Sequence, residues 1–453
     1  MSALSAKPLN APRVLTAGEG FVIKQLGIRV IAACFLLCAF PGVAADSAQT
    51  SAPGSGSLEA LLQSALNEHP LVDAGKAEIR SAQQGVKSAR WQFFPTPGVE
   101  YQRAFADDAD GTFQGDDYTT VISLEQPLWS GGRISGGVAS ARAALGVSQA
   151  SLQENQRELA LRVVQAYGEW LTASLQKDTL EASELRHLNL FERVRRRMEG
   201  GVSTGSDLQL ASGRLQSVKS ERAAIEARER SAIAVLSELS GRSLTLSIME
   251  KARRNLPQEL VLLEASLVDR ALSHSPSIER ADAQVESARA EIKTRRAQTR
   301  PNVFLRFERQ FNNLQFANQG PDSRVLVGVR SQFGAGLSSY SGIAEARETV
   351  SAALAFRRSA ELSIREQVRT DLALLKSFEI RLPALHEATR TAIEVYESYQ
   401  HQFLTGRKSW LDVMNSARDL QQARLQLADV IAGHLTLSWR LYVLANPLQA
   451  IGG

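Results

Sequence analysis

The hydrophobic positions of this chain follow two different periods, and the period changes at a proline. Along Leu58–Trp91 the apolar residues recur every three or four positions, which predicts an amphipathic helix with Ser57 as its N-cap. Beyond Pro95 apolar and polar residues alternate, which predicts β-strands. The first two strands are expected at Val99–Phe105 and Tyr118–Leu124.

A second pair of alternating segments follows two hundred residues later, at Val303–Phe311 and Val325–Val329. Alternation over ~10 residues fits a half-buried sheet in a soluble protein, and it equally fits a tilted transmembrane strand. Four strands cannot close a barrel, and lipid excludes an open sheet edge. Membrane strands would therefore require several copies of the chain, and three copies would supply twelve strands.

Aromatic residues gather where the predicted strands meet the predicted helices. They are Trp91, Phe94, Trp129 and Phe333. Such positions suit the aromatic girdle that membrane proteins carry at the lipid–water interface.

The helices predicted after the strands are too long for an ordinary globular domain. Ile134–Met198 contains no proline, and apolar residues recur in it at every seventh position. That heptad predicts a left-handed coiled coil. His187 is the polar member, expected to pack or to set the register rather than to bind a metal. In the second long helix Arg357 and Asp371 interrupt the heptad, and Pro383 should kink the helix.

Each long helix ends at a glycine-bearing turn and returns as a helix of about half its length. The turns are expected at Gly200–Ser206 and Thr405–Ser409, and the return helices at Asp207–Leu239 and Trp410–Leu444. Laid end to end, a return helix and the helix before the strands match one long helix.

The order of these elements occurs twice, because Gly131–Ser240 shifted by 205 positions lands on Gly336–Ala445 without a gap. The predicted fold class is mainly α with a membrane β-barrel, built from duplicated half-subunits. The predicted divisions are a signal peptide at 1–45, a first repeat at 46–240, a connector at 241–264, a second repeat at 265–446 and a tail at 447–453.

The N-terminal segment predicts export. Arg29 precedes the apolar run Val30–Phe40, and Val43–Ala45 supplies the small residues of a cleavage site. A run of eleven residues is too short to span a bilayer. A lipidation box ending at Cys34 is the alternative, although cleavage after Ala45 is preferred because the apolar run continues past Cys34.

Both cysteines lie in that signal, so the mature chain would hold no disulfide, no catalytic thiolate and no Cys-ligated metal. The signal also carries four basic residues and one acidic residue, which reduces the net charge from +4 to +1 after cleavage. The basic composition is therefore no argument for nucleic acid.

Catalytic and cofactor patterns are weak. The six histidines are scattered and form no metal-binding spacing, and no nucleophile elbow occurs. Arg195–Arg197 fits a solvated helix face or a partner contact. Gly131–Gly137 lacks the Gly-Lys-Ser/Thr ending of a phosphate loop. We therefore expect neither an enzyme nor a cofactor.

Nearly all of the mature length resembles the TolC-type outer-membrane efflux or secretion channels, the outer membrane factors. The residues that carry the resemblance are Gln126–Gly132, Gly201–Leu208 and Gly406–Val413, in that order within the duplication. The resemblance implies a homotrimer in the outer membrane of a Gram-negative bacterium. A twelve-stranded barrel would continue as a twelve-helix tunnel through the periplasm. A periplasmic adaptor and an inner-membrane transporter would dock at its tip.

The resemblance also implies a gate at the helix tips. Asp207 and Asp412 match the acidic positions of the family, Lys408 stands where Arg is common, Phe403 where Tyr is common, and Asn415 where Asp is common. This predicts a gate with fewer charge-assisted bonds. Asp207 could also serve as an ordinary N-cap. The expected adaptor-docking residues are Gly201, Val202, Ser203, Gly406, Arg407 and Ser409.

Gln332–Ser339 and Gly406–Asp412 are most similar to the branch that exports large adhesins by type I secretion with an ABC transporter. Drug efflux with a proton-driven pump is the alternative within the class. A periplasmic coiled-coil adaptor or scaffold without a pore is the alternative outside it, and it predicts a single hairpin without membrane strands.

Overall fold

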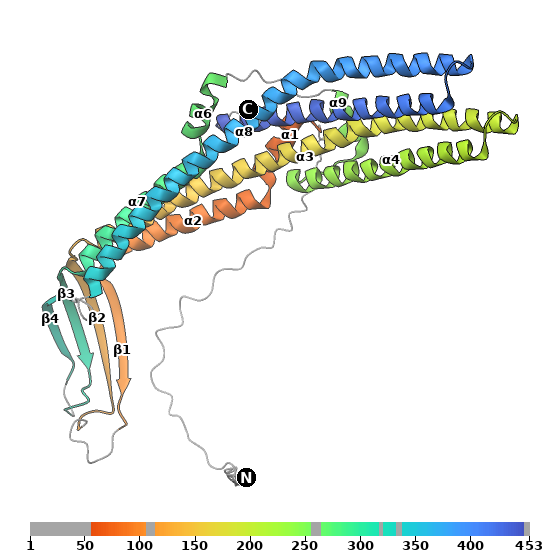
Figure 1. The fold of residues 1–453 in the computed structure, drawn as a ribbon. Helices are drawn as coiled ribbons and strands as arrows, with labels where there is room; N and C mark the ends of the chain where they lie inside the picture. The colour runs from red at the N-terminus through yellow and green to blue at the C-terminus, as the bar shows by residue number, and fades with distance from the viewer. Residues whose placement is uncertain (1–55, 106–113, 255–263, 317–319, 332–337, 448–453) are drawn as a thin grey trace, which may run out of the picture. The chain divides into compact units, whose positions relative to one another are not determined.

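The computed structural model describes residues 56–105, 114–254, 264–316, 320–331 and 338–447, all within one compact unit. Figure 1 shows its helices and strands. The first repeat comprises α1 (Leu58–Glu68), α2 (Pro70–Trp91), β1 (Thr96–Arg103), β2 (Tyr118–Trp129), α3 (Arg133–Glu199) and α4 (Gly205–Ser240). After α5 (Leu246–Arg254), the second comprises α6 (Glu264–Ser273), α7 (Pro276–Gln298), β3 (Asn302–Phe311), β4 (Asp322–Arg330), α8 (Ser338–Leu404) and α9 (Trp410–Ala445).

The helix bounds repeat to the residue. A shift of 205 positions carries both ends of α3 onto those of α8, and both ends of α4 onto those of α9. Gly201 and Gly406, one in each turn between paired helices, have φ of 73° and 75°. Glycine adopts this left-handed conformation without the steric cost that a Cβ brings. The two turns are therefore built alike.

The helix expected over Leu58–Trp91 is divided at His69, so that prediction was wrong. His69 has extended backbone angles and Pro70 begins α2, because a proline disfavours helical angles in the residue before it. The His69 side chain caps the new helix, since its Nδ1 accepts a hydrogen bond from the Leu71 amide at 3.1 Å. The predicted N-cap of α1 is confirmed, because Ser57 accepts a hydrogen bond from the amide of Ala60.

Helix α3 lies between several neighbours: it packs against α4, α7, α9 and α2, whereas α8 packs mainly against α9 and α7. Figure 1 shows α3 beside α4 and α8 beside α9. The predicted heptad of α3 is buried from Leu159 to Val194, while Leu145 and Leu152 are partly exposed. The main core combines Leu159 and Ala166 of this heptad with residues of α1, α4 and α9, and its largest side chains are Tyr167 and Trp170.

His187 occupies its heptad position as a buried, hydrogen-bonded residue. Its Nδ1 lies 2.9 Å from the Ser183 carbonyl oxygen, and Ser183 Oγ donates to Gln421 on α9. Gln421 in turn donates to Glu221 on α4 at 2.8 Å. Burial lowers the pKa of His187. The polar contacts thus join α3, α9 and α4 at one level of the bundle.

The two charged residues that interrupt the heptad of α8 each have an ionic partner. Asp371, which is buried, pairs with Arg440 of α9 at 3.1 Å. Arg357 pairs with Asp282 of α7 and with Glu361. At these two heptad positions an ion pair therefore takes the place of the apolar contact that a heptad residue usually makes. The helix continues through Pro383.

The strands form one antiparallel sheet in the order β1-β2-β3-β4, so β2 and β3 join the two repeats. β1 ends at Arg103, two residues before the predicted end, and Phe105 lies beyond it. Within the expected connector, α5 forms a helix at 246–254.

Candidate functional sites: the strand sheet and the helix tips

The antiparallel register separates the sheet into an apolar face and a polar face. Leu124 lies opposite Phe307, and Phe307 opposite Val325, so apolar residues meet across three strands. The exposed apolar side chains of this face are Val99, Tyr101, Ile122, Leu124, Leu305, Phe307, Val325, Val327 and Val329. A continuous apolar surface of this kind indicates contact with lipid or protein rather than water.

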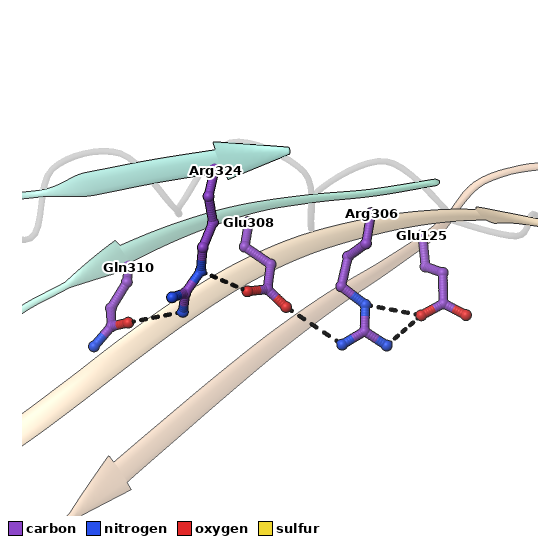
Figure 2. A network of polar contacts seen from close by, with 5 residues as sticks. All are labelled: Glu125, Arg306, Glu308, Gln310 and Arg324. Atoms are coloured by element: carbon purple, nitrogen blue, oxygen red, sulfur yellow. Dashed lines mark hydrogen bonds and ion pairs between the residues drawn. The ribbon is translucent and has the colours of Figure 1, made fainter. Parts of the chain in front are cut away.

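The opposite face carries a chain of charged residues that crosses three strands, shown in Figure 2. Arg306 Nε donates to Glu125 Oε2 at 2.9 Å, and Arg306 Nη1 lies 3.3 Å from Glu308 Oε1. Arg324 Nε donates to the other oxygen of Glu308 at 2.9 Å, and its Nη2 donates to Gln310 at 3.2 Å. Positive and negative groups alternate, so the charges of this face neutralise one another locally.

One aromatic ring lies on the polar face near the helix end of the sheet. Phe304 lies over Gly328, where a Cβ would come within 2.3 Å of the ring. The guanidinium carbons of Arg306 and Arg330 are 5.2 and 5.0 Å from the ring centre. Only a glycine leaves room for this ring, and the two cations favour its faces.

The predicted interfacial aromatics are exposed. Trp91 and Phe94 present more than half of their surfaces to solvent and Trp129 about half, and the ring centres of Trp91 and Phe94 are 5.1 Å apart. Phe333 lies outside the described residues.

At the first tip, Thr204 and Asp207 form a capping box at the start of α4. The Thr204 amide donates to Asp207 Oδ2 at 2.9 Å, and the Asp207 amide donates to Thr204 Oγ1 at 3.2 Å. These hydrogen bonds, led by the one from the Thr204 amide, lower the pKa of Asp207. The adjoining Gly201, Val202 and Ser203 complete the turn, and Val202 is 66 % exposed.

At the second tip, Ser409 and Asp412 form the equivalent box at the start of α9. The Ser409 amide and hydroxyl donate to Asp412 Oδ2 at 3.1 and 2.8 Å. The hydroxyl, the amide and the charge of Lys408 lower the pKa of Asp412. Gly406, Arg407 and Asn415 are exposed.

Two residues of the second tip have aromatic partners. Lys408 Nζ lies 4.4 Å from the centre of the Tyr399 ring. Phe403 is only 4 % exposed, packs with Val413 and Met414, and has the guanidinium carbon of Arg197 from the first hairpin 5.0 Å from its ring centre. In this subunit Phe403 therefore belongs to the core of the tip rather than to its surface.

A family comparison covers both repeats. The model described as "Outer membrane efflux protein" matches residues 61–242 and 267–446, which is most of the chain. This chain belongs to the outer membrane efflux protein family.

Solved structures with the same fold include three membrane proteins. VceC of Vibrio cholerae is 15 % identical, with 86 % of this chain and 96 % of that chain covered at a TM-score of 0.72. A membrane protein of Pseudomonas aeruginosa is 16 % identical, with 86 % and 90 % covered at 0.74. The open state of the MtrE channel of Neisseria gonorrhoeae is 17 % identical, with 87 % and 89 % covered at 0.63. No curated protein sequence matches this chain.

As a member of the family, this efflux protein is an outer-membrane transport protein and not an enzyme. The pore-free scaffold considered above is thereby set aside. Among the described helices, none has an apolar stretch long enough to cross a bilayer. In the same described ranges no three His, Cys, Asp or Glu side chains lie together as a metal site requires.

The structure brings the two tips of this efflux protein into contact through a residue that sequence reasoning missed. Trp410 packs against the apolar cluster that includes Ala211 of α4, and its side chain further lowers the pKa of Asp207. Trp410 stands at the first helical position of α9, where the first repeat has Gly205. The sequence signal for this contact is a difference between the repeats: a tryptophan stands at the first position of α9, where α4 begins with a glycine.

Proposed function

We propose that three copies of this efflux protein assemble into one channel, with twelve strands in the outer membrane and twelve helices in a periplasmic tunnel. The observation that carries the proposal is the two-faced sheet. Its apolar face suits lipid, its alternating charges suit a water-filled lumen, and four strands need further strands on both edges to close. Paired helices α3–α4 and α8–α9 would supply four tunnel helices per copy.

The tip residues support a gate at the tunnel entrance. Asp207, Asp412 and Lys408 are ionic groups at the ends of the hairpins, and Asn415 lies one helical turn beyond Asp412. Their capping and cation–π contacts hold both turns in one conformation. Phe403 would contribute through packing, because its ring has no hydroxyl and is buried.

The exposed turn residues are proposed to dock a periplasmic adaptor. Gly201, Val202 and Ser203 of the first tip and Gly406, Arg407 and Ser409 of the second belong to the two turns that cap the hairpins. An exposed valine beside backbone groups of a glycine turn offers both apolar and hydrogen-bonding contact. The adaptor would link the channel to an inner-membrane transporter.

For the transported substrate we favour a large secreted protein such as an adhesin, passed by a type I system with an ABC transporter. The resemblance of Gly406–Asp412 to that branch supports it. The alternative is a small molecule expelled with a proton-driven pump. Deleting the gene separates the two: loss of one large protein from the culture medium supports secretion, and increased drug sensitivity with an unchanged medium supports efflux.

The channel itself is tested in planar lipid bilayers with the purified protein. We expect trimers by light scattering and stepwise conductance. Asp412→Asn should alter the cation preference, because it removes one charge per copy at the entrance. Asp419→Asn, an exposed change of the same charge on the same helix, is the matched control. A monomer that passes no ions would overturn the proposal.

A further inference from the structure

A polar cavity of about 530 Å³ lies away from both the sheet and the tips, where α1, α3 and the start of α7 meet. Amide side chains line much of it. They are Gln63 and Asn67 from α1, and Gln153 and Gln156 from α3. His274, just before α7, adds an imidazole. A cavity of this size and polarity is suited to a small hydrated or hydrogen-bonding molecule.

The cavity contains a buried arginine whose hydrogen-bonding capacity is not filled. Arg157 is 7 % exposed. Its Nη2 donates to the Asn446 carbonyl at 3.0 Å, but its Nε has no hydrogen-bond partner, and no described carboxylate forms an ion pair with it. Burial lowers the pKa of Arg157 to about 10, against the opposing effect of Glu279. A buried cation without a carboxylate partner is costly, and an anion in the cavity that Arg157 lines would offset that cost.

The start of α7 adds a second attraction for an anion. Pro276 occupies its first turn and lines the cavity, and Ser275 makes no capping bond to the helix because its hydroxyl is paired with that of Ser277. The N-terminal end of a helix carries a partial positive charge. This charge and the Arg157 side chain therefore border the same cavity.

Comparison of the repeats indicates that this arrangement is particular to one end of the bundle. At the equivalent start of α2, the His69 side chain caps the Leu71 amide. The repeat equivalent of Arg157 is Leu362, which is 62 % exposed. Neither the uncapped end nor the buried cation recurs in the other repeat, so the duplicated fold does not require them.

One acidic group opposes an anion at this site. Glu279, in the first turn of α7, is exposed and lines the cavity. The neighbouring Glu154 is paired with Arg280 at 2.5 Å and so contributes little net charge. Arg157 is the only cation described in the cavity lining apart from the imidazole of His274.

We infer that the cavity at Arg157 binds a small organic carboxylate, with the carboxylate on Arg157 and the start of α7 and the rest of the molecule against the amide side chains. The planar guanidinium matches the geometry of a carboxylate, and the amides match a peptide-like or hydroxylated remainder. Phosphate shares the oxyanion chemistry, and the experiment distinguishes the two.

The test is isothermal titration of the full-length protein in detergent with N-acetylglycine, with its neutral amide, and with inorganic phosphate. The acid should bind at least about tenfold more tightly than the amide, because a charge-assisted hydrogen bond is roughly twice as strong as a neutral one. Equal binding of acid and amide would overturn the assignment. Tighter binding of phosphate than of N-acetylglycine would overturn the choice of carboxylate.

Variants locate the binding in the cavity. Arg157→Gln should weaken the acid about tenfold or more, while Arg162→Gln, the same change at an exposed position of α3, should leave it unchanged. Because loss of a buried arginine can prevent folding, Glu279→Gln gives an independent reading. It should tighten binding severalfold by removing the opposing charge, and unchanged or weaker binding in that variant would contradict the site.

Discussion

Helices α3 and α8 have the same length and the same place in their repeats, yet their surroundings differ. In α3 the heptad residues from Leu159 to Val194 are buried, and the helix packs against α2, α4, α7 and α9. In α8 Phe356 and Ile380 remain 69 % and 76 % exposed. The repeat thus sets where a helix begins and ends, while its position among the other helices sets how much of it is covered.

The exposed apolar residues of α8 indicate that another molecule covers part of this helix. Large apolar side chains are costly to leave in water, and groups of them mark surfaces that another molecule covers. α8 packs only against α6, α7 and α9 among the described elements with more than marginal contact, as expected for a helix at the edge of a subunit in the proposed ring. The interruptions Arg357 and Asp371 face α7 and α9, so they do not account for this exposed surface.

The largest effect on stability should come from a substitution in α3, which is better buried than α8. Trp170→Ala removes a fully buried indole that packs against Tyr167 with ring centres 5.0 Å apart. We expect a loss of about 3–5 kcal/mol in the free energy of unfolding, measured by chemical denaturation of the separated subunit. Phe356→Ala is the control in α8 and should cost far less there. Equal losses of unfolding free energy in the two variants would contradict the difference in burial between α3 and α8.

A second effect should appear in the association of the subunits and not in the stability of the separated subunit. Ile380→Ser and Phe356→Ser should weaken association of the subunits by roughly tenfold or more each, if those side chains are buried between copies. Sedimentation velocity in detergent measures the association, and unfolding of the separated subunit should be unchanged. A trimer as stable as that of the unmodified protein would place these residues on the outside of the ring.

A smaller effect concerns the buried pair between α8 and α9. Burial raises the pKa of Asp371, and Arg440 opposes that shift. A carboxyl with a raised pKa in the folded state contributes stability that is complete below its ordinary pKa of 3.8 and is lost as pH rises through the folded value. Relative to Asp371→Asn, the unmodified protein should therefore gain stability as pH falls from about 7 toward 4. A difference in melting temperature that does not vary with pH would contradict the assigned shift.

The smallest effect concerns the two tips. Thr204→Ala and Ser409→Ala each remove the hydroxyl of a capping box, which costs about 1 kcal/mol of local stability. Amide hydrogen exchange should accelerate in the first turn of α4 or α9 respectively. The tip that is not mutated serves as the control. Faster exchange at both tips in either variant would mean that the tips are stabilised jointly.

Much of the fold could be predicted because its determinants are local. The change of period at Pro95, the heptad of α3 and the turn glycines all act over a few residues, and the observed bounds of α3, α4 and α9 lie within a few residues of the predicted ones. The division at His69 was missed although Pro70 was its signal. The apolar stripe continues on both sides of it, which masked the break.

The site residues were harder to predict because their contacts are made between segments distant in sequence. Asp207 and Asp412 were recognised from position, but the packing of Trp410 against the first hairpin joins two repeats. The charged chain from Glu125 to Arg324 depends on the strand register, which alternation alone leaves open. Arg157 follows no motif at all, and its hydrogen-bond partner, the Asn446 carbonyl, is almost three hundred residues away in the sequence.

The indole of Trp410 offers a built-in optical reporter. Because the ring packs in the apolar cluster that joins the two hairpins at their tips, any separation of the hairpins exposes it to a different solvent environment and shifts its emission. Replacing Trp91, Trp129, Trp170 and Trp439 by phenylalanine would leave this one fluorophore. Opening of the entrance could then be followed in real time, without attaching a dye.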